Sequence, residues 1–409
     1  MTTLSMLWDI FWIFLKLGCT SFGGPIAHIG FFRSEFVQKQ RWLSERDYFD
    51  LVALCQFLPG PASSQVGMAI GLLRCGYAGA LLAWLGFTLP SALLMLGLAL
   101  SLSEFADKVP SELLHGLKLA ALAVIAQAVY AMAKNYCSTW KTAAITGLSL
   151  LLLSISTAVY WQVITILCGA LLGLVLLNAT SNGVSAPAKS LTNISKATGL
   201  VWGLLFLLLL FGLPLINLTL QSPFISSFDA FYRAGSLVFG GGHAVLPMLQ
   251  ADFVSTGAVP ADNFIAGYGA VQAVPGPLFS FAGFLGASVS AEFINTSTGT
   301  GMTTGLLGGV VGLIAIFLPA FLLIAAVLPF WQEVRHNPWM QKASAGIGAS
   351  VVAILLNTLY HPVWTSTIFS VVDFGIAVIG FLTLQFGKVS PLQLVMASLG
   401  LSLAAHLLL

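Results

Sequence analysis

Long apolar stretches without a charged residue constrain this chain more than any other feature of its sequence. Residues 199–215 read GLVWGLLFLLLLFGLPL, and similar stretches recur along the 409 residues. Only 7% of the residues are charged, whereas a soluble globular protein has roughly 25%. Inside a bilayer only helices and closed barrels satisfy their backbone groups, and barrel strands would appear as short alternating segments. The sequence therefore predicts an all-α polytopic membrane protein.

The remaining composition excludes several classes of function. A net charge of +2 without a basic cluster gives no sign of nucleic-acid binding. The five cysteines are scattered and form no CxxC pair, so neither a disulfide framework nor a zinc site is expected. No phosphate-binding GxxxxGK[ST] loop, HExxH motif or pair of catalytic acids is found. We therefore predict that the protein is not an enzyme and needs no cofactor.

Three motifs occur twice, in the same order, which indicates an internal duplication. FWIFLKLGCTSFGG at 11–24 returns as FDAFYRAGSLVFGG at 228–241, so that Lys16 corresponds to Arg233. QFLPGPASSQVG at 56–67 returns as QAVPGPLFSFAG at 272–283. GALLAWLGFTLPSALL at 79–94 returns as GGVVGLIAIFLPAFLL at 308–323. The chain is therefore predicted to consist of two homologous halves.

The placement of basic residues predicts that the two halves have opposite orientations. Segment 33–47 contains Arg33, Lys39, Arg41 and Arg46, whereas the corresponding segment 250–264 contains no Lys or Arg. The positive-inside rule places the first segment in the cytoplasm and the second outside. An inverted repeat of this kind is common in secondary transporters. We expect a first repeat over 1–180, a linker with an orientation-inverting span over 181–222, and a second repeat over 223–409.

Each half is expected to begin with broken helices. Residues 5–21 and 25–38 are separated by FGGP, and residues 48–58 and 61–73 are separated by PGP. All four segments are shorter than the roughly 20 residues that a membrane span needs. They are predicted to form re-entrant hairpins or discontinuous helices, repeated at 223–256 and 260–292. The expected full spans are 76–103, 113–134, 142–157, 159–178, 198–220, 303–330, 343–361, 363–386 and 389–408.

The duplicated breaks are candidate anion-binding sites. In Pro59-Gly60-Pro61 and Pro275-Gly276-Pro277 the prolines lack an N–H and the glycine interrupts the helix. The helix that follows presents unpaired N–H groups and the positive end of its dipole. The glycines of Phe22-Gly23-Gly24 and Phe239-Gly240-Gly241-Gly242 allow an anion to approach the backbone closely. The alternative is that these breaks are packing kinks, but four symmetrically placed breaks favour a substrate site.

Polar residues beside the breaks complete the predicted site. Lys16 and Arg233 each precede their FGG by six residues, and a cation at membrane depth favours a counter-anion. The alternative is that both side chains extend to the nearer membrane surface. Histidines after the glycines either contact the anion, carry a proton or simply pack. Asp50 and Glu292 are candidate proton carriers, although structural roles are the commoner explanation. Further candidate ligands are His28, Gln56, Ser63, Ser64, His243, Gln272 and Ser280.

These paired motifs resemble those of the chromate ion transporter family in its fused two-domain form. The resemblance is carried by FGGPIAHIGFF and QFLPGPASSQVG in one half and by VFGGGHAVLPML and QAVPGPLFSFAG in the other. It implies a multi-pass protein of the bacterial inner membrane that exports chromate, driven by the membrane potential or a proton gradient, and confers chromate resistance. Sulfate or another oxyanion as substrate, and an anion channel, are the alternatives. A coupling proton and a homodimer are additional hypotheses.

Overall fold

The computed structural model describes residues 3–105, 111–155, 159–178, 194–220, 222–239, 242–293, 301–334, 337–387 and 389–408, and all regular structure within these ranges is helical. The first half comprises α1 (Thr3–Thr20), α2 (Gly24–Phe32), η1 (Arg33–Lys39), α3 (Glu45–Phe57), α4 (Ala62–Phe105), α5 (Ser111–Tyr136), α6 (Trp140–Leu153) and α7 (Val159–Leu176). Helix α8 (Lys196–Leu220) follows.

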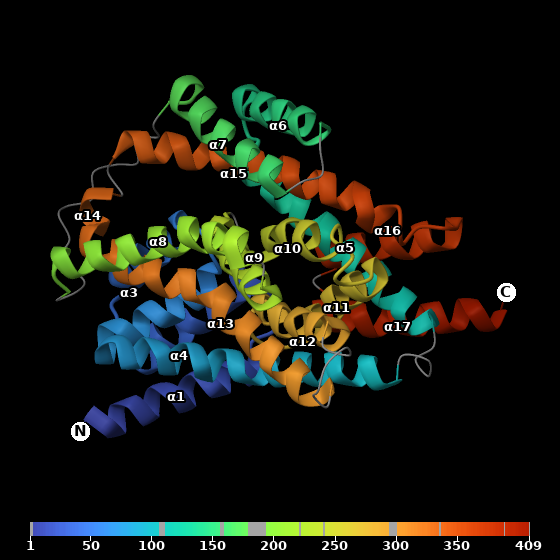
Figure 1. The fold of residues 1–409 in the computed structure, drawn as a ribbon, viewed down its shortest axis with the longest axis horizontal. Coiled ribbons are helices and arrows are strands. Elements are labelled where there is room, and N and C mark those ends of the chain that lie inside the picture. The colour runs from blue at the N-terminus through green and yellow to red at the C-terminus, as the bar shows by residue number, and fades with distance from the viewer. Residues whose placement is uncertain are drawn as a thin grey trace.

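The second half repeats this order (Figure 1). It comprises α9 (Pro223–Leu237), η3 (Gly242–Ala244), α10 (Val245–Phe253), α11 (Ala261–Ala273), η4 (Leu278–Ser280), α12 (Phe281–Phe293), α13 (Gly301–Val327), η5 (Leu328–Phe330), α14 (Trp331–Val334), α15 (Pro338–Thr358), η6 (Leu359–Trp364), α16 (Val371–Phe386) and α17 (Pro391–Leu408). The prediction of an all-α chain with two homologous halves is confirmed.

Local sequence signals explain where several helices begin and end. The Ser44 hydroxyl accepts a hydrogen bond from the Asp47 N–H at the start of α3, and Thr139 and Ser370 form capping boxes at the starts of α6 and α16. These caps satisfy backbone N–H groups that would otherwise be unpaired. Helix α4 is interrupted at Cys75 and Gly76, where Gly76 has a φ of 64°. The interruption separates a short arm over 62–74 from a full-length span.

The broken helices at the start of each half are present. Helix α2 continues into η1, and the two together cover residues 24–39, while α10 has nine residues. Both segments are shorter than the roughly 20 residues that a membrane span needs. The two halves pack these segments in the same way. The Phe14 and Phe36 rings pack at a tilt with 5.0 Å between their centroids, and their counterparts Phe231 and Phe253 do so at 4.7 Å.

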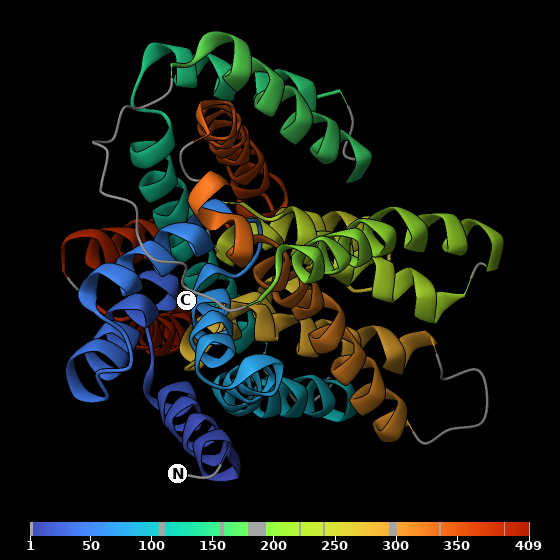
Figure 2. The same cartoon turned by 90° about the vertical axis from the view of Figure 1, so that its left-hand side faces the viewer.

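The end of each half packs against the other half. Helices α6 and α7 of the first half lie on α15 of the second, whereas α16 and α17 of the second half lie on α5 of the first. In Figure 1, α6 and α7 are at the top beside α15, and Figure 2 shows them at the edge opposite α1. This exchange is reciprocal, as expected for halves related by a two-fold rotation.

The outer surface is suited to lipid. Among the described residues, five helices are long and apolar enough to cross a membrane. In the apolar 18-residue stretch of α8 only 11% is buried inside the protein. Leu200, Leu204, Leu208 and Phe211 are exposed. Trp202 Nε1 donates a hydrogen bond to Tyr77 Oη at 2.8 Å and connects α8 to α4. Such a surface would be unstable in water, so the chain is a multi-pass membrane protein.

Candidate functional site

The two proline-glycine-proline breaks connect the halves through reciprocal backbone hydrogen bonds. Gly60 N–H of the first half donates to the Val238 carbonyl of the second at 2.6 Å. Gly276 N–H of the second half donates to the Ser21 carbonyl of the first at 3.0 Å. Gly60 and Gly276 have φ values of 119° and 101°, which residues other than glycine rarely adopt.

These hydrogen bonds bring all four breaks to the interface between the halves. Ser21 and Val238 occupy equivalent positions, each immediately before the Phe-Gly-Gly motif of its half. Each proline-glycine-proline loop therefore contacts the Phe-Gly-Gly break of the opposite half. A Cβ atom added to Gly242 would lie 3.1 Å from Leu278 Cδ1 and 3.7 Å from Pro25 Cγ. The breaks that the sequence predicted as separate sites in each half are thus close together in one region.

Helix N-termini at these breaks have no side-chain caps. Gly23, with a φ of 99°, precedes α2, and no side chain accepts a hydrogen bond from the first turn of that helix. The same is true of η4, which leads into α12. The first N–H groups of a helix have no partner within the helix and carry the positive end of its dipole. The breaks therefore present backbone donors that are suited to a bound anion.

His28 is a buried connection between the two breaks of the first half. Its Nε2 lies 3.2 Å from the Ser21 carbonyl and its Nδ1 lies 3.3 Å from Ser63 Oγ. Since a carbonyl only accepts, Nε2 carries the proton and Nδ1 accepts from the Ser63 hydroxyl. The ring packs edge-on against Phe87 at 5.2 Å. Both nitrogens thus have protein partners, which favours a positioning role for His28.

Several buried polar atoms around the breaks have no hydrogen-bond partner within the described part of the chain. Near the breaks in the sequence these are the donors Ser21 Oγ, Ser64 Oγ and Gln272 Nε2 and the acceptor Gln65 Oε1; Thr88 Oγ1 is a further donor. Thr88 follows Phe87, whose carbonyl oxygen lies 3.2 Å from the position that a Cβ on Gly276 would take. Leaving a buried polar group unpaired costs about 1–3 kcal/mol. A ligand that accepts hydrogen bonds would remove this cost for the hydroxyls and for the Gln272 amide nitrogen.

The two repeat-equivalent cations have different environments. Lys16 is exposed on α1, and its charge acts on Glu35. Arg233 is largely buried on α9, where Nη2 lies 2.9 Å from Asp252 Oδ1 and Nη1 lies 3.4 Å from Asp229 Oδ2. Arg233 is therefore already paired with two carboxylates.

The other predicted site residues are distributed unevenly. Gln56 is exposed, whereas its counterpart Gln272 is buried. Ser280 Oγ donates to the Pro277 carbonyl at 2.8 Å, and His243 Nδ1 lies 2.6 Å from Tyr268 Oη. Gly23 is exposed, while Phe22, Gly24, Phe239, Pro59 and Pro275 are half-buried and Gly60, Pro61, Gly276 and Pro277 are buried. Gly240, Gly241 and the side chain of Glu292 lie outside the described residues.

Sequence reasoning missed Ser21, which lies at a break, and Asp229 and Asp252, which pair with Arg233. The sequence did contain a signal for Asp252, because Glu35 occupies the equivalent position of the first repeat and an acid is therefore repeated. Asp229 precedes Arg233 by four residues, a spacing that places both on one face of a helix. Ser21 acts through its backbone carbonyl, so its residue type gave no signal.

Known proteins with related sequences include chromate transport proteins. The chromate transport protein of Pseudomonas aeruginosa is 28% identical over 85% of this chain and 79% of its own length. The probable chromate transport protein of Synechococcus elongatus is 27% identical over 85% and 84%, respectively. The chromate transport protein of Cupriavidus metallidurans is 25% identical over 97% and 92%. No solved structure matches the chain.

A family model for chromate transporters matches the chain twice, over residues 8–174 and 225–403. The two matches correspond to the two structural halves, and each includes one Phe-Gly-Gly and one proline-glycine-proline break. The resemblance drawn from these motifs is confirmed: the chain belongs to the chromate transporter family.

Proposed function

We propose that this protein exports chromate from the cytoplasm by alternating access, and that the anion binds where the four helix breaks meet. The observation that carries this proposal is the reciprocal pair of hydrogen bonds from Gly60 to Val238 and from Gly276 to Ser21. Through them each half supplies two breaks to one shared region. Export in this direction confers chromate resistance, and the membrane potential or a proton gradient supplies the energy.

Chromate is a tetrahedral dianion, and it requires several hydrogen-bond donors from different directions. Uncapped N–H groups of α2 and η4 provide fixed donors and the positive ends of helix dipoles. The Ser64 hydroxyl and the Gln272 amide provide two further donors without a protein partner in the described part of the chain. Lys16 adds a positive charge on α1, the helix that precedes the first break. Because the donors come from both halves, a movement of one half against the other opens the site to alternate sides.

Sulfate is the second candidate substrate, since it is also a tetrahedral dianion. Backbone N–H groups recognise shape and charge and do not distinguish the central atom. The same site is therefore expected to bind both ions, with the preference decided by size. An anion channel is the alternative mechanism, and it differs from a transporter in being unable to move chromate against its gradient.

Chromate uptake into inside-out membrane vesicles tests this function. We expect chromate to accumulate inside the vesicles above its external concentration when a proton gradient or a membrane potential is imposed. Excess sulfate should inhibit this accumulation. Removal of the unpartnered hydroxyl by Ser64→Ala is expected to weaken chromate affinity about tenfold, because a hydrogen bond to a charged group contributes about 1.5 kcal/mol or more. The matched control is Ser288→Ala, whose hydroxyl donates to its own helix at the Phe284 carbonyl. Equal affinities of the two variants would contradict the assigned site, and uptake that never exceeds equilibrium would indicate a channel.

A further inference from the structure

A cavity of about 470 Å³ leads from the surface of the second half to a buried charged cluster. Its lining includes Ser226 and Thr256, which are exposed, and Asp229, Arg233 and Asp252, which lie deeper. Serine and asparagine side chains from the ends of α8 and α9, together with Thr256 after α10, make much of the wall polar. Water can therefore reach a group of ionisable side chains through this cavity.

The cluster, which consists of Asp229, Arg233 and Asp252, contains two carboxylates for one guanidinium. The carboxylate side chains of Asp229 and Asp252 are only 6% and 10% exposed. Asp252 Oδ2 and Arg233 Nε are buried and have no hydrogen-bond partner among the described residues. With both carboxylates ionised the cluster has a net charge of −1, and an uncompensated buried charge is costly. Binding of one proton makes the cluster neutral.

We propose that the Asp229–Arg233–Asp252 cluster binds the proton that drives transport. A hydronium ion in the cavity transfers its proton to a carboxylate oxygen of the pair, so that one O–H bond forms and one water molecule is released. The reverse step returns the proton to water on the other side after the halves have moved. The two aspartates titrate as one unit because they share Arg233. This inference rests on the proposed secondary transport and identifies its coupling site.

Other charged groups do not neutralise the cluster within the described residues. Helices α8, α13, α10, α7 and α15 pack around α9 or α10. The sequences of α7 and α13 contain no Lys, Arg, Asp or Glu. In α8 and α15 the charged residues are Lys196, which pairs with Glu333, and Lys342, which lies over the Trp339 ring. On α9 itself, Tyr232 Oη donates to the Phe206 carbonyl at 3.0 Å; Glu292 of α12 has a side chain outside the described residues.

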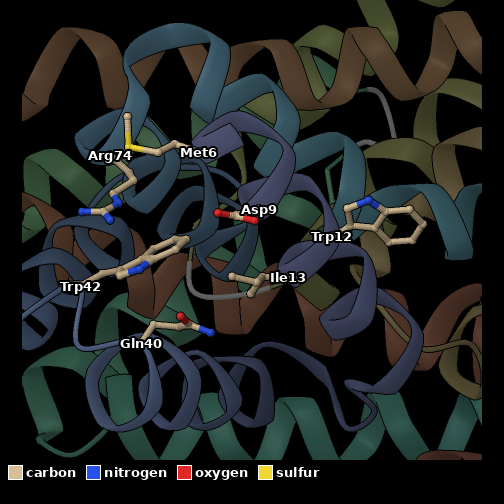
Figure 3. Close-up of a pocket in the computed structure, with 7 residues that line it drawn as sticks. All are labelled: Met6, Asp9, Trp12, Ile13, Gln40, Trp42 and Arg74. Atoms are coloured by element: carbon tan, nitrogen blue, oxygen red, sulfur yellow. The ribbon is translucent and has the colours of Figure 1, made fainter. Parts of the chain in front are cut away.

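The first half contains the equivalent cavity without the carboxylate pair. This cavity has a volume of about 390 Å³ and is lined by Met6, Asp9, Trp12, Ile13, Gln40, Trp42 and Arg74, as Figure 3 shows. Trp12 is the repeat equivalent of Asp229, so an indole replaces the first carboxylate. Glu35, the counterpart of Asp252, pairs with Lys39 at 3.0 Å. The duplicated fold therefore provides two cavities but only one two-carboxylate cluster among the residues that line them.

The orientation of the halves gives the cluster a direction. Segment 33–47 is basic and segment 250–264 is not, which places the cavity beside Asp252 on the outer side of the membrane. Protons that enter this cavity come from outside. Their inward movement is the direction that would drive the export of an anion.

Infrared spectroscopy of the full-length protein in lipid tests proton binding without any substrate. We expect a protonated-carboxyl band that appears and disappears with pH in the wild type and that is lost in both Asp252→Asn and Asp229→Asn. The matched control is Glu35→Gln, which removes the acid at the repeat-equivalent position of the first half and should retain the band. Persistence of the titrating band in both aspartate variants would overturn the proposal.

Transport measurements then separate this inference from the proposed function. In inside-out vesicles with an imposed pH gradient, Asp252→Asn is expected to reduce chromate accumulation at least tenfold and to change chromate–chromate exchange less than twofold. Glu35→Gln should behave as the wild type in both assays. If the wild type carries no chromate, the proposed function fails while the infrared result still stands. If wild-type accumulation ignores the pH gradient, or if Asp252→Asn accumulates normally, the coupling site is wrong.

Discussion

The first and second halves share the same order of helices and helix breaks but differ in how their charged side chains are paired. At equivalent positions Lys16 is exposed, whereas Arg233 is fixed between two carboxylates. Gln56 is exposed and Gln272 is buried. The breaks themselves are alike, with a positive φ at both Gly60 and Gly276. Duplication thus preserved the backbone donors of both halves, while the side chains around them diverged.

The difference indicates a division of roles between the halves. Backbone donors at an interface with two-fold symmetry suit one substrate that contacts both halves. The Asp229–Arg233–Asp252 cluster has no equivalent in the described part of the first half, which suits proton binding from only one side of the membrane. If this division is correct, equivalent substitutions in the two halves should have unequal effects wherever side chains differ and similar effects wherever only the backbone acts.

The largest inequality is expected for the two cations. Arg233→Ala leaves Asp229 and Asp252 buried without a counter-ion, and removal of one partner of a buried pair costs about 3–5 kcal/mol. Lys16→Ala removes an exposed side chain and should change stability by less than about 0.5 kcal/mol. Apparent melting temperatures of the two purified variants in detergent measure the difference. Adding Asp252→Asn to Arg233→Ala should restore part of the loss, and equal melting of both single variants would refute the unequal roles.

The break glycines should show a smaller inequality. Alanine at either Gly60 or Gly276 is strained by about 1–3 kcal/mol because of the positive φ. At Gly276 the new Cβ would also lie 3.2 Å from the Phe87 carbonyl oxygen, which belongs to a helix backbone. At Gly60 the nearest atom is Gln65 Nε2, at 2.9 Å, the end of a side chain that can move at the cost of its hydrogen bond to the Pro59 carbonyl. The apparent melting temperature of Gly276→Ala should therefore be lower than that of Gly60→Ala. The reverse order would mean that the backbone of α4 at Phe87 shifts more easily than the Gln65 side chain.

The sequence predicted the breaks because glycine and proline leave direct signals in the chain. The FGG and PGP motifs were found at the places where α1, α3, α9 and α11 end. The repeat also predicted that both halves have the same order of helices. It did not predict that Gly60 contacts Val238 and Gly276 contacts Ser21, since a repeat shows which segments are equivalent and not which segments touch.

The sequence likewise did not predict that Arg233 is paired with two carboxylates. The notion of a pair of substrate-binding cations depended on Lys16 and Arg233 being equivalent in sequence. Whether a cation is available depends on the residues that face it, and Asp252 approaches Arg233 from a different helix. Exposure differs for the same reason: Gln56 and Gln272 share a position in the motif but not the packing around it.

A moderate inequality is expected for the two glutamines. Gln272 Nε2 is buried and makes no hydrogen bond in the described structure, and the Gln272 amide lies near the Tyr268 hydroxyl. If it donates to chromate, Gln272→Leu should weaken the affinity about tenfold, which corresponds to about 1.4 kcal/mol. Gln56→Leu, at an exposed position, should change it less than twofold. Direct binding of chromate to the purified variants is the measurement, and a larger effect at Gln56 would assign the side-chain donor to the first half.

The smallest effect is expected for an ion pair outside the membrane. Arg33 contacts Glu45 through two hydrogen bonds of 2.7 and 2.9 Å, and both side chains are nearly half exposed. The hydrogen bond from Arg33 holds the pKa of Glu45 below its ordinary value of 4.5. The pair therefore stabilises the fold above about pH 4.5 and loses this contribution as the pH falls through the lowered pKa.

Glu45→Gln should consequently change the apparent melting temperature only slightly at neutral pH, because solvent screens exposed pairs. High salt should remove the small difference in melting temperature between the wild type and Glu45→Gln. Acid should remove it as well, because Glu45 of the wild type is then uncharged. A loss comparable to that of Arg233→Ala would mean that Arg33 and Glu45 lie in a medium of low dielectric constant. Since segment 33–47 is the basic segment assigned to the cytoplasm, that result would contradict the opposite orientation of the two halves and, with it, the outward direction of the Asp252 cavity.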